Sequence, residues 1–203
     1  MAQTLTRNRL LILLFTLAYT LGFGAYFISH GNFEFAWYVF VLLGFIAFIS
    51  YMMQKVPLPD SVLVLLSAWG LLHMMGGGIP VGESVLYSYR IFPFYDGGGE
   101  FFILKFDQLV HMYGFGVGAV AIHWLIRTRA PSVKPLWRSL LAALASMGLG
   151  TVNEVAEFAA VIAVEETGVG GYHNIALDLV FNLIGALLAV GVLELYLHLK
   201  KKA

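Results

Sequence analysis

Long apolar runs separated by short polar segments form the main pattern along this chain. A helix that crosses the hydrocarbon core of a bilayer needs about 20 mostly apolar residues. Six segments approach this length, at about residues 10–29, 35–53, 61–75, 106–126, 136–164 and 176–198. The pattern therefore predicts an all-α, polytopic membrane helical bundle with six transmembrane helices, in which residues 1–203 form a single integral membrane domain.

The composition supports this fold class and excludes several functions. Hydrophobic residues make up 60% of the 203 residues and charged residues only 12%, about half the charged share of a soluble domain. The formal net charge is zero, so we expect no nucleic-acid partner. The chain has no cysteine, which excludes disulfides, thiolate nucleophiles and cysteine-ligated metals. The sequence identifies membrane lipids as partners, and it identifies no protein partner.

Basic residues are distributed unevenly between the two sides of the predicted helices. Ten of the twelve Lys and Arg residues lie on one side, and only Arg90 and Lys105 lie on the other. Because cytoplasmic segments are enriched in basic residues, we expect both termini in the cytoplasm and a long outer loop, at about residues 76–105, between helices 3 and 4. Arg7 and Arg9 precede the first apolar run, but no A-x-A cleavage site follows, so we expect an uncleaved first helix.

Polar residues three or four positions apart interrupt three of the predicted helices, and this spacing places each set on one helix face. The sets are Asp107 and His111 in the fourth helix, Asn153, Glu154 and Glu157 in the fifth, and Asp178 and Asn182 in the sixth. Small residues continue the same faces, which allows neighbouring helices to approach closely. An ionisable group that faces lipid costs several kcal/mol. We therefore expect the three sets to face one another across a polar pocket in the outer half of the membrane.

This inventory of side chains suggests metal chemistry, because imidazole nitrogen and carboxylate oxygen together suit Zn, Mn or Fe. The candidate ligands of a divalent metal are His73, Asp107, His111, Glu157, His173 and Asp178. The candidate catalytic groups are His111, Glu154 and Glu157, since hydrolysis needs either a metal-activated water or a general base. The candidate binding residues are Asp96, Tyr113, Asn153, Tyr172 and Asn182.

Simpler interpretations of the same residues remain open. The polar pairs can hydrogen-bond neighbouring helices together, a role worth about 0.6 kcal/mol per bond. The glutamates fit this role less well, since Glu154 and Glu157 repel each other unless one is protonated or both meet a cation. Aromatic residues of the outer loop can lie at the interface or cover the pocket as a lid, and the alternation in "VLYSYRIF" indicates a short strand or hairpin. Ion passage is less favoured, because we expect no buried charge below the polar layer.

Several short motifs resemble those of the VanZ-like membrane proteins, and among these the chain is most similar to the YjdF-type inner-membrane proteins. The motifs are "FDQLVHMYGFG" at residues 106–116, "NEVAEF" at 153–158 and "YHNIALDLVFNLIGALL" at 172–188, with "HMMGGG" at 73–78 and "YD" at 95–96. The resemblance covers about residues 73–190 and implies a protein of the bacterial envelope, located in the inner membrane. VanZ-like proteins often have Asp-Lys in the first motif, where this chain has Asp107 and Gln108.

Two functional hypotheses follow from these patterns. In the first, the protein is an envelope enzyme or lipid-modifying factor, because a pocket in the outer leaflet suits a lipid or lipid-linked substrate. In the second, it is a non-enzymatic binding protein or accessory subunit that captures a lipid, an antibiotic or another amphiphilic small molecule, or a partner helix, and the buried polar cluster is structural.

Overall fold

The computed structural model describes residues 6–56, 58–99, 101–163, 171–200 and 202. Six long helices occupy most of these residues: α1 (Arg7–Ser29), α2 (Phe33–Lys55), α3 (Asp60–Gly78), α4 (Phe106–Arg129), α5 (Pro135–Ala163) and α6 (Tyr172–Lys200). Each contains a stretch that is long and apolar enough to cross a membrane. The prediction of a polytopic helical bundle with six candidate spans is therefore confirmed.

Two helix boundaries differ from the predicted ones in ways that matter for the site. α3 runs to Gly78 instead of ending near residue 75, so its three final glycines are helical. An added Cβ at Gly77 would lie 2.0 Å from the ring of Phe35, so aromatic rings pack directly on this glycine backbone. α6 begins at Tyr172, four residues earlier than expected. The predicted end of the fifth helix, residue 164, lies outside the described residues.

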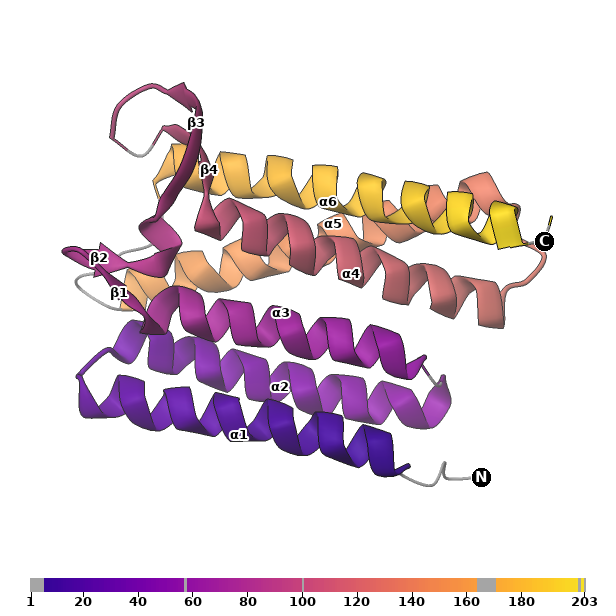
Figure 1. Cartoon of the computed structure of the whole chain (residues 1–203), viewed down its shortest axis with the longest axis horizontal. Helices are drawn as coiled ribbons and strands as arrows, with labels where there is room; N and C mark the ends of the chain where they lie inside the picture. The colour runs from indigo at the N-terminus through magenta and orange to yellow at the C-terminus, as the bar shows by residue number, and fades with distance from the viewer. Residues whose placement is uncertain (1–5, 57, 100, 164–170, 201, 203) are drawn as a thin grey trace.

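The helices lie roughly along one direction, with α1, α2 and α3 in one half of the bundle and α4, α5 and α6 in the other (Figure 1). The most extensive helix interface joins α4 and α6, and α3 links the two halves through α4. Both chain ends lie at one end of the bundle, and the short strands lie at the opposite end (Figure 1). We refer to these as the terminal end and the strand end.

The long loop at the strand end contains five short elements: β1 (Pro80–Val81), β2 (Ser84–Val85), the 3-10 helix η1 (Leu86–Ser88), β3 (Arg90–Asp96) and β4 (Phe102–Lys105). β1 pairs with β2 and β3 with β4, both antiparallel. η1 lies against α3 and α4 and buries Tyr87, whereas the β3–β4 hairpin projects beyond the helix ends (Figure 1). The sequence left open whether this loop covers the pocket as a lid, and η1 is the part of the loop that packs onto the helices.

Small residues allow the close approach of the helices in the second half. An ideal Cβ at Gly185 of α6 would lie only 1.9 Å from the carbonyl oxygen of Met112 on α4, and one at Gly116 would lie 3.0 Å from the Gly185 carbonyl oxygen. α5 joins this contact through Ser146, whose hydroxyl donates to the carbonyl oxygen of Phe115 at 2.6 Å. The backbones of α4 and α6 therefore touch over this stretch, which brings their polar side chains together.

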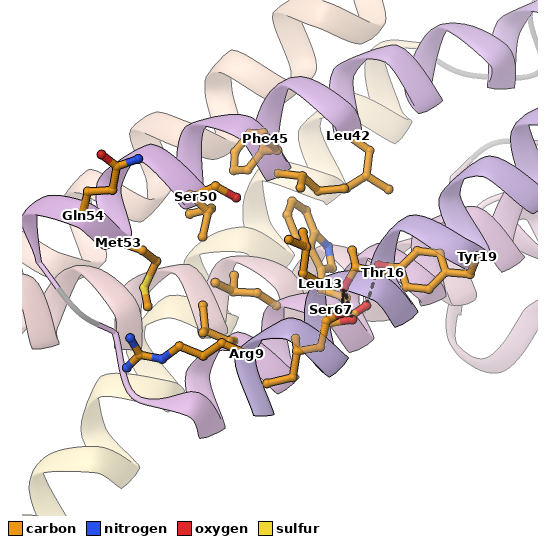
Figure 2. A pocket seen from close by; sticks show the side chains of 16 residues that line it. Arg9, Leu13, Thr16, Tyr19, Leu42, Phe45, Ser50, Met53, Gln54 and Ser67 are labelled. Carbon is orange, nitrogen blue, oxygen red and sulfur yellow. Dashed lines mark hydrogen bonds between the residues drawn. The ribbon is translucent and has the colours of Figure 1, made fainter. Parts of the chain in front are cut away.

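The first half of the bundle is held differently and contains a cavity. α1 is tied to α3 by the hydroxyls of Thr16 and Ser67, 2.7 Å apart, and by Tyr19, whose hydroxyl donates to the carbonyl oxygen of Ser67 at 2.8 Å. A mostly apolar cavity of about 300 Å³ lies between α1, α2 and α3 (Figure 2).

Candidate functional site

His111 is the centre of a polar cluster that α4, α5 and α6 build together. Its Nε2 lies 3.5 Å from Oδ1 of Asp107, one turn earlier on α4. Its Nδ1 lies 3.1 Å from Oδ1 of Asn182 on α6 and 3.5 Å from Oε1 of Glu154 on α5. The His111, Glu154, Asp178 and Asn182 side chains are all buried. The structure thus brings together the three polar sets that the sequence distributes over separate helices.

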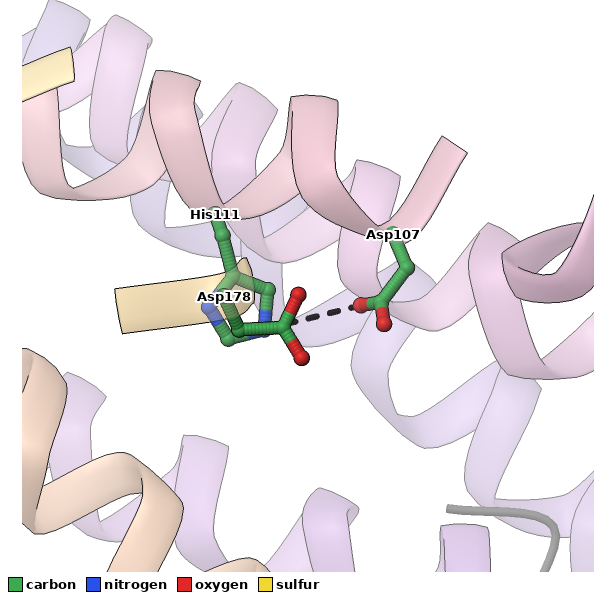
Figure 3. Close-up of side chains that lie close together, drawn as sticks. All are labelled: Asp107, His111 and Asp178. Atoms are coloured by element: carbon green, nitrogen blue, oxygen red, sulfur yellow. Dashed lines mark ion pairs between the residues drawn. The ribbon is translucent and has the colours of Figure 1, made fainter. Parts of the chain in front are cut away.

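Two groups of side chains in this cluster have the geometry of a metal site. Asp107, His111 and Asp178 each offer one ligand atom within 4.8 Å of the others (Figure 3). His111, Glu154 and Glu157 form a second such group. His111 belongs to both groups; Asp107 lies beside its Nε2 and Glu154 beside its Nδ1.

The spacing of these atoms is wider than that of ordinary hydrogen bonds. Nitrogen–oxygen hydrogen bonds usually span about 2.7–3.2 Å, whereas both carboxylate contacts of His111 measure 3.5 Å. Bonds of about 2.0–2.2 Å to a tetrahedral metal place neighbouring ligand atoms about 3.3–3.6 Å apart. The distance between Nε2 of His111 and Oδ1 of Asp107 falls in this range.

Several buried oxygens of the cluster have no hydrogen-bond donor among the described residues. These are both carboxylate oxygens of Glu154 and Oδ1 of Asp178. Burying a carboxylate oxygen without a donor is costly, and native proteins rarely leave such atoms unpaired. The cluster also contains four carboxylates, whereas Lys105 and His111 supply at most two positive charges. Bound protons or a divalent cation must balance this excess of negative charge.

Asn174 and Lys105 close the cluster on its strand-end side. Nδ2 of Asn174 donates to Oδ2 of Asp178 at 2.7 Å and to Oδ2 of Asp107 at 3.3 Å, so it bridges carboxylates of α4 and α6. The Lys105 ammonium donates to Oδ1 of Asn174. The sequence reasoning missed both residues because it assigned them to loops. The spacing of Asn174, four residues before Asp178, was the available signal for a shared helix face.

Gln108 fixes the start of α4 and with it the position of Asp107 and His111. The side chain is fully buried, and its Oε1 accepts from the backbone N–H groups of Leu104 at 2.6 Å and Lys105 at 3.1 Å. Its Nε2 donates to the carbonyl oxygen of Phe102 at 3.0 Å. Leu104 has a φ of 83°, a left-handed conformation that costs a non-glycine residue about 1–3 kcal/mol. The Gln108 side chain stabilises this turn just before Asp107.

Asn153 and Asn182 orient the groups beside the histidine. Asn153 donates through Nδ2 to Oε1 of Glu157 at 2.8 Å, within α5. Asn182 presents its carbonyl oxygen to Nδ1 of His111 at 3.1 Å. In the neutral tautomer with its proton on Nδ1, Asn182 accepts that proton and Nε2 keeps its lone pair on the side of Asp107.

His73 belongs to a neighbouring aromatic cluster and to neither ligand group. It shares a hydrogen bond with the hydroxyl of Tyr87, and the rings of Tyr38 and Trp69 lie close beside it. Burial raises the pKa of Tyr87 well above 10, and the negative charges of the cluster, first that of Asp107, raise it further. Tyr87 is therefore a neutral hydroxyl at neutral pH, situated between His73 and the acidic residues.

Four other predicted site residues lie away from the cluster. Asp96 is exposed and pairs with Arg90 in the β3–β4 hairpin at 3.4 Å. His173 is exposed and stacks on Phe101, and Tyr172 is 83% exposed beside it. The Tyr113 hydroxyl donates to the carbonyl oxygen of Leu65 on α3 at 3.1 Å. The structure thus places these residues at the surface or at another helix contact.

A second buried polar cluster lies nearer the terminal end of α4, α5 and α6. Nε2 of His123 is 2.8 Å from Oε1 of Glu194, and Nε of Arg138 donates to that ring nitrogen at 3.1 Å. His123 and Arg138 are both buried, so the expectation that no buried charge lies below the first cluster is wrong. From its position in the sequence we expected Arg138 on the aqueous side of the membrane. In the structure its side chain instead extends between the helices. An apolar layer separates the two clusters and consists of Ala119, Ala142, Ala143, Ala186 and Val190.

Comparison with known proteins places the chain in a family. No curated protein matches the chain, and no solved structure matches it. The family model described as "Predicted membrane protein (DUF2238)" matches residues 10–199, which is nearly the whole chain. The resemblance to VanZ-like proteins stays a prediction, as does the narrower YjdF-type assignment. The chain belongs to the DUF2238 family of predicted membrane proteins.

Proposed function

We propose that the cluster around His111 is a divalent metal site of an integral protein of the bacterial inner membrane. Both termini would face the cytoplasm, so the site would lie toward the outer leaflet. One observation carries the metal proposal: carboxylate oxygens that find no hydrogen-bond donor in the described part of the chain converge on one buried imidazole. Zn, Mn and Fe fit the mixed nitrogen and oxygen ligands.

Asp107, His111 and Asp178 are the better of the two ligand groups. In the tautomer with its proton on Nδ1, His111 donates to Asn182, which leaves the Nε2 lone pair for the metal on the side of Asp107. Asn174 holds Asp107 and Asp178 together through one amide nitrogen. Second-shell hydrogen bonds of this kind orient metal ligands.

Glu154 and Glu157 are then the candidates for proton transfer. Both are buried on α5, and each has a carboxylate oxygen within 4.8 Å of a ring nitrogen of His111. A metal-bound water is acidic enough to be deprotonated near neutral pH, and Glu157, held by Asn153, would accept such a proton. Hydrolysis is the reaction class that uses these parts.

The surroundings of the site favour a lipid or lipid-linked envelope substrate. The β3 strand exposes Phe92, Phe94 and Tyr95 at the strand end of the bundle, and exposed aromatic side chains are typical of a membrane interface. β4 of the same hairpin leads directly into α4. A substrate that rests on the hairpin would lie at the interface, close to the helix that carries Asp107 and His111.

A second candidate is a non-enzymatic binding protein or accessory subunit, and a specific observation favours it. Lys105 and Asn174 cover the cluster on its strand-end side, and the cavity in Figure 2 lies in the other half of the bundle. In this function the metal, or a set of bound protons, joins α4, α5 and α6 without contacting a substrate.

Metal analysis tests the site itself. The purified protein, dialysed free of metal and then exposed to Zn²⁺, Mn²⁺ or Fe²⁺, should retain about one equivalent of one of them by mass spectrometry. Asp178→Asn and His111→Gln should each weaken this binding at least 10-fold, whereas Glu83→Gln, an exposed acidic residue of the same loop region, should leave it unchanged. Absence of metal from both the native protein and the variants refutes the site.

Two further measurements test the chemistry and the orientation. Incubation of the metal-loaded protein with an inner-membrane lipid extract should change specific lipids by mass spectrometry, and Glu157→Gln should abolish the change while it preserves the metal. Metal binding without any lipid change supports the non-enzymatic candidate instead. Alkaline phosphatase fused to the C-terminus should be inactive, since it folds only outside the cytoplasm, and an active fusion contradicts the proposed orientation.

A further inference from the structure

The cavity between α1, α2 and α3 has no role in the metal site and carries an inference of its own. Its volume is about 300 Å³, and most of its lining is aliphatic or aromatic (Figure 2). The two buried hydroxyls in its wall, of Thr16 and Ser67, bond to each other. These two hydroxyls therefore need no hydrogen-bond partner from an occupant, and an apolar occupant suits the cavity best.

The cavity has the length of one membrane leaflet. Its lining extends along α1 from Arg9 to Tyr19 and along α2 from Leu42 to Gln54. At a rise of about 1.5 Å per residue these stretches are about 15–18 Å long. One leaflet contributes about half of a hydrocarbon core about 30 Å thick. The cavity thus extends from the terminal end of the bundle to about the middle of the membrane.

The occupant must be thin. A helix with its side chains is about 10–12 Å across, so a helix segment 15 Å long needs several times the volume available here. Water would find few partners among walls such as Leu13, Phe45 and Ile49. A single extended acyl chain fits the length and the apolar lining.

The open end of the cavity is basic. Arg9 and Gln54 both line the cavity at this end (Figure 2), and Lys55 follows Gln54 on α2, with its ammonium 5.8 Å from the centre of the Tyr51 ring. The Arg129 guanidinium reaches the same place from α4 and donates to the carbonyl oxygen of Lys55. Asp60 pairs with Arg9 at 2.9 Å, so three basic residues and one acidic residue lie at this end of the bundle. Basic residues near the membrane surface attract anionic phosphate groups, so this end favours an anionic head group.

We propose that the cavity binds one acyl chain of an anionic phospholipid, with its phosphate near Arg9 and the end of α2. This site is separate from the metal cluster in both location and chemistry. The bound lipid fills the space between α2 and the rest of the bundle and stabilises α2 against α1 and α3. The site lies in the leaflet at the terminal end, so it holds a resident lipid and not the substrate of the strand-end site.

Trp69 provides a direct probe of the proposal. It lines the cavity, and its indole packs on Gly114 of α4, where an added Cβ would lie 2.0 Å from the ring nitrogen. The test protein retains Trp69 alone, with the other three tryptophans replaced by Phe. It is reconstituted in vesicles of phosphatidylcholine that contain 10% dibrominated lipid, either phosphatidylglycerol or phosphatidylcholine, because bromine quenches indole fluorescence on contact.

We expect dibrominated phosphatidylglycerol to quench Trp69 at least threefold more strongly than dibrominated phosphatidylcholine. Ser50→Phe fills the cavity from α2 and should remove the difference, whereas Gly44→Phe adds the same ring to α2 at a position with open space and should preserve it. Lys55→Gln should reduce the preference at least twofold, and Lys200→Gln at the end of α6 should not.

The outcomes separate the proposal from its competitors. Equal quenching by the two lipids, in a protein that keeps its thermal unfolding transition, refutes the anionic site. Strong quenching that persists in Ser50→Phe refutes the cavity as its location. Metal retention, measured on the same samples, reports the strand-end cluster independently, so a failure there leaves the result for the lipid site unaffected.

Discussion

Gly185 of α6 is the position where the smallest substitution should have the largest effect on the bundle. An ideal Cβ at this residue would lie 1.9 Å from the backbone carbonyl oxygen of Met112 on α4, and the Met112 carbonyl carbon would be 2.6 Å away. Backbone atoms cannot rotate aside as the end of a side chain can. Gly185→Ala must therefore separate α4 from α6 by about 1 Å to reach even a tight contact of 3.0 Å.

Two opposing contributions determine how much Gly185→Ala changes the free energy of unfolding. Alanine in place of glycine favours a helix by about 0.8–1 kcal/mol, whereas overpacking of a close contact typically costs about 1–3 kcal/mol and occasionally more. Gly191→Ala gains the same propensity on the same helix without a clash, because no atom lies within 4 Å of its Cβ position. The difference between the two variants is therefore the packing cost alone, about 1–3 kcal/mol.

Thermal unfolding in detergent measures this difference. With about 2–4 °C for each kcal/mol in a chain of this size, Gly185→Ala should unfold about 2–12 °C below Gly191→Ala. It should also weaken metal retention, since Asp107 and His111 lie on α4 and Asp178 lies on α6. Equal unfolding temperatures for the two variants would show that α4 and α6 do not touch here, and the geometry of the cluster would then be wrong as well.

Two other changes test the remaining buried polar groups. Glu194→Gln removes the counter-ion of Arg138 in the terminal-end cluster and should destabilise the protein by about 1–3 kcal/mol; a denaturation series that matches that of Glu83→Gln contradicts this. Tyr87→Phe tests the raised pKa of that phenol: because the folded pKa exceeds the unfolded value of about 10, stability should be unaffected below pH 10 and fall above it. The variant should lose less stability between pH 10 and 11 than the native protein, and an identical loss in both refutes the assignment.

The spans and the convergence of the polar sets were predictable because both depend on regular spacing. Apolar runs of about 20 residues define spans, and residues three or four apart share a face wherever the helix continues. His111, Glu154 and Asp178 followed from these two rules alone. The cost of exposing such groups to lipid left the bundle interior as their location.

The spacing of residues along the sequence did not predict the side-chain contacts at helix ends and in loops. The early start of α6 made Asn174 a helical residue, and Lys105 reaches the cluster only because Gln108 fixes the turn before α4. His73 is on α3, but its direction is set by Tyr87 from η1, which no periodic pattern predicts. Arg138 is long enough to reach inward from near the start of α5, so its position in the sequence did not reveal its burial.

The division of the bundle into two halves has a consequence for how this fold tolerates change. Every ligand atom of the proposed metal site lies on α4, α5 or α6, whereas the cavity belongs to α1, α2 and α3. The halves touch where Trp69 fits against Gly114, and polar groups also cross between them, from Tyr113 to the carbonyl oxygen of Leu65 and from Arg129 to that of Lys55. Substitutions that reshape the cavity wall away from these contacts can therefore accumulate, or be engineered, without altering the residues around His111.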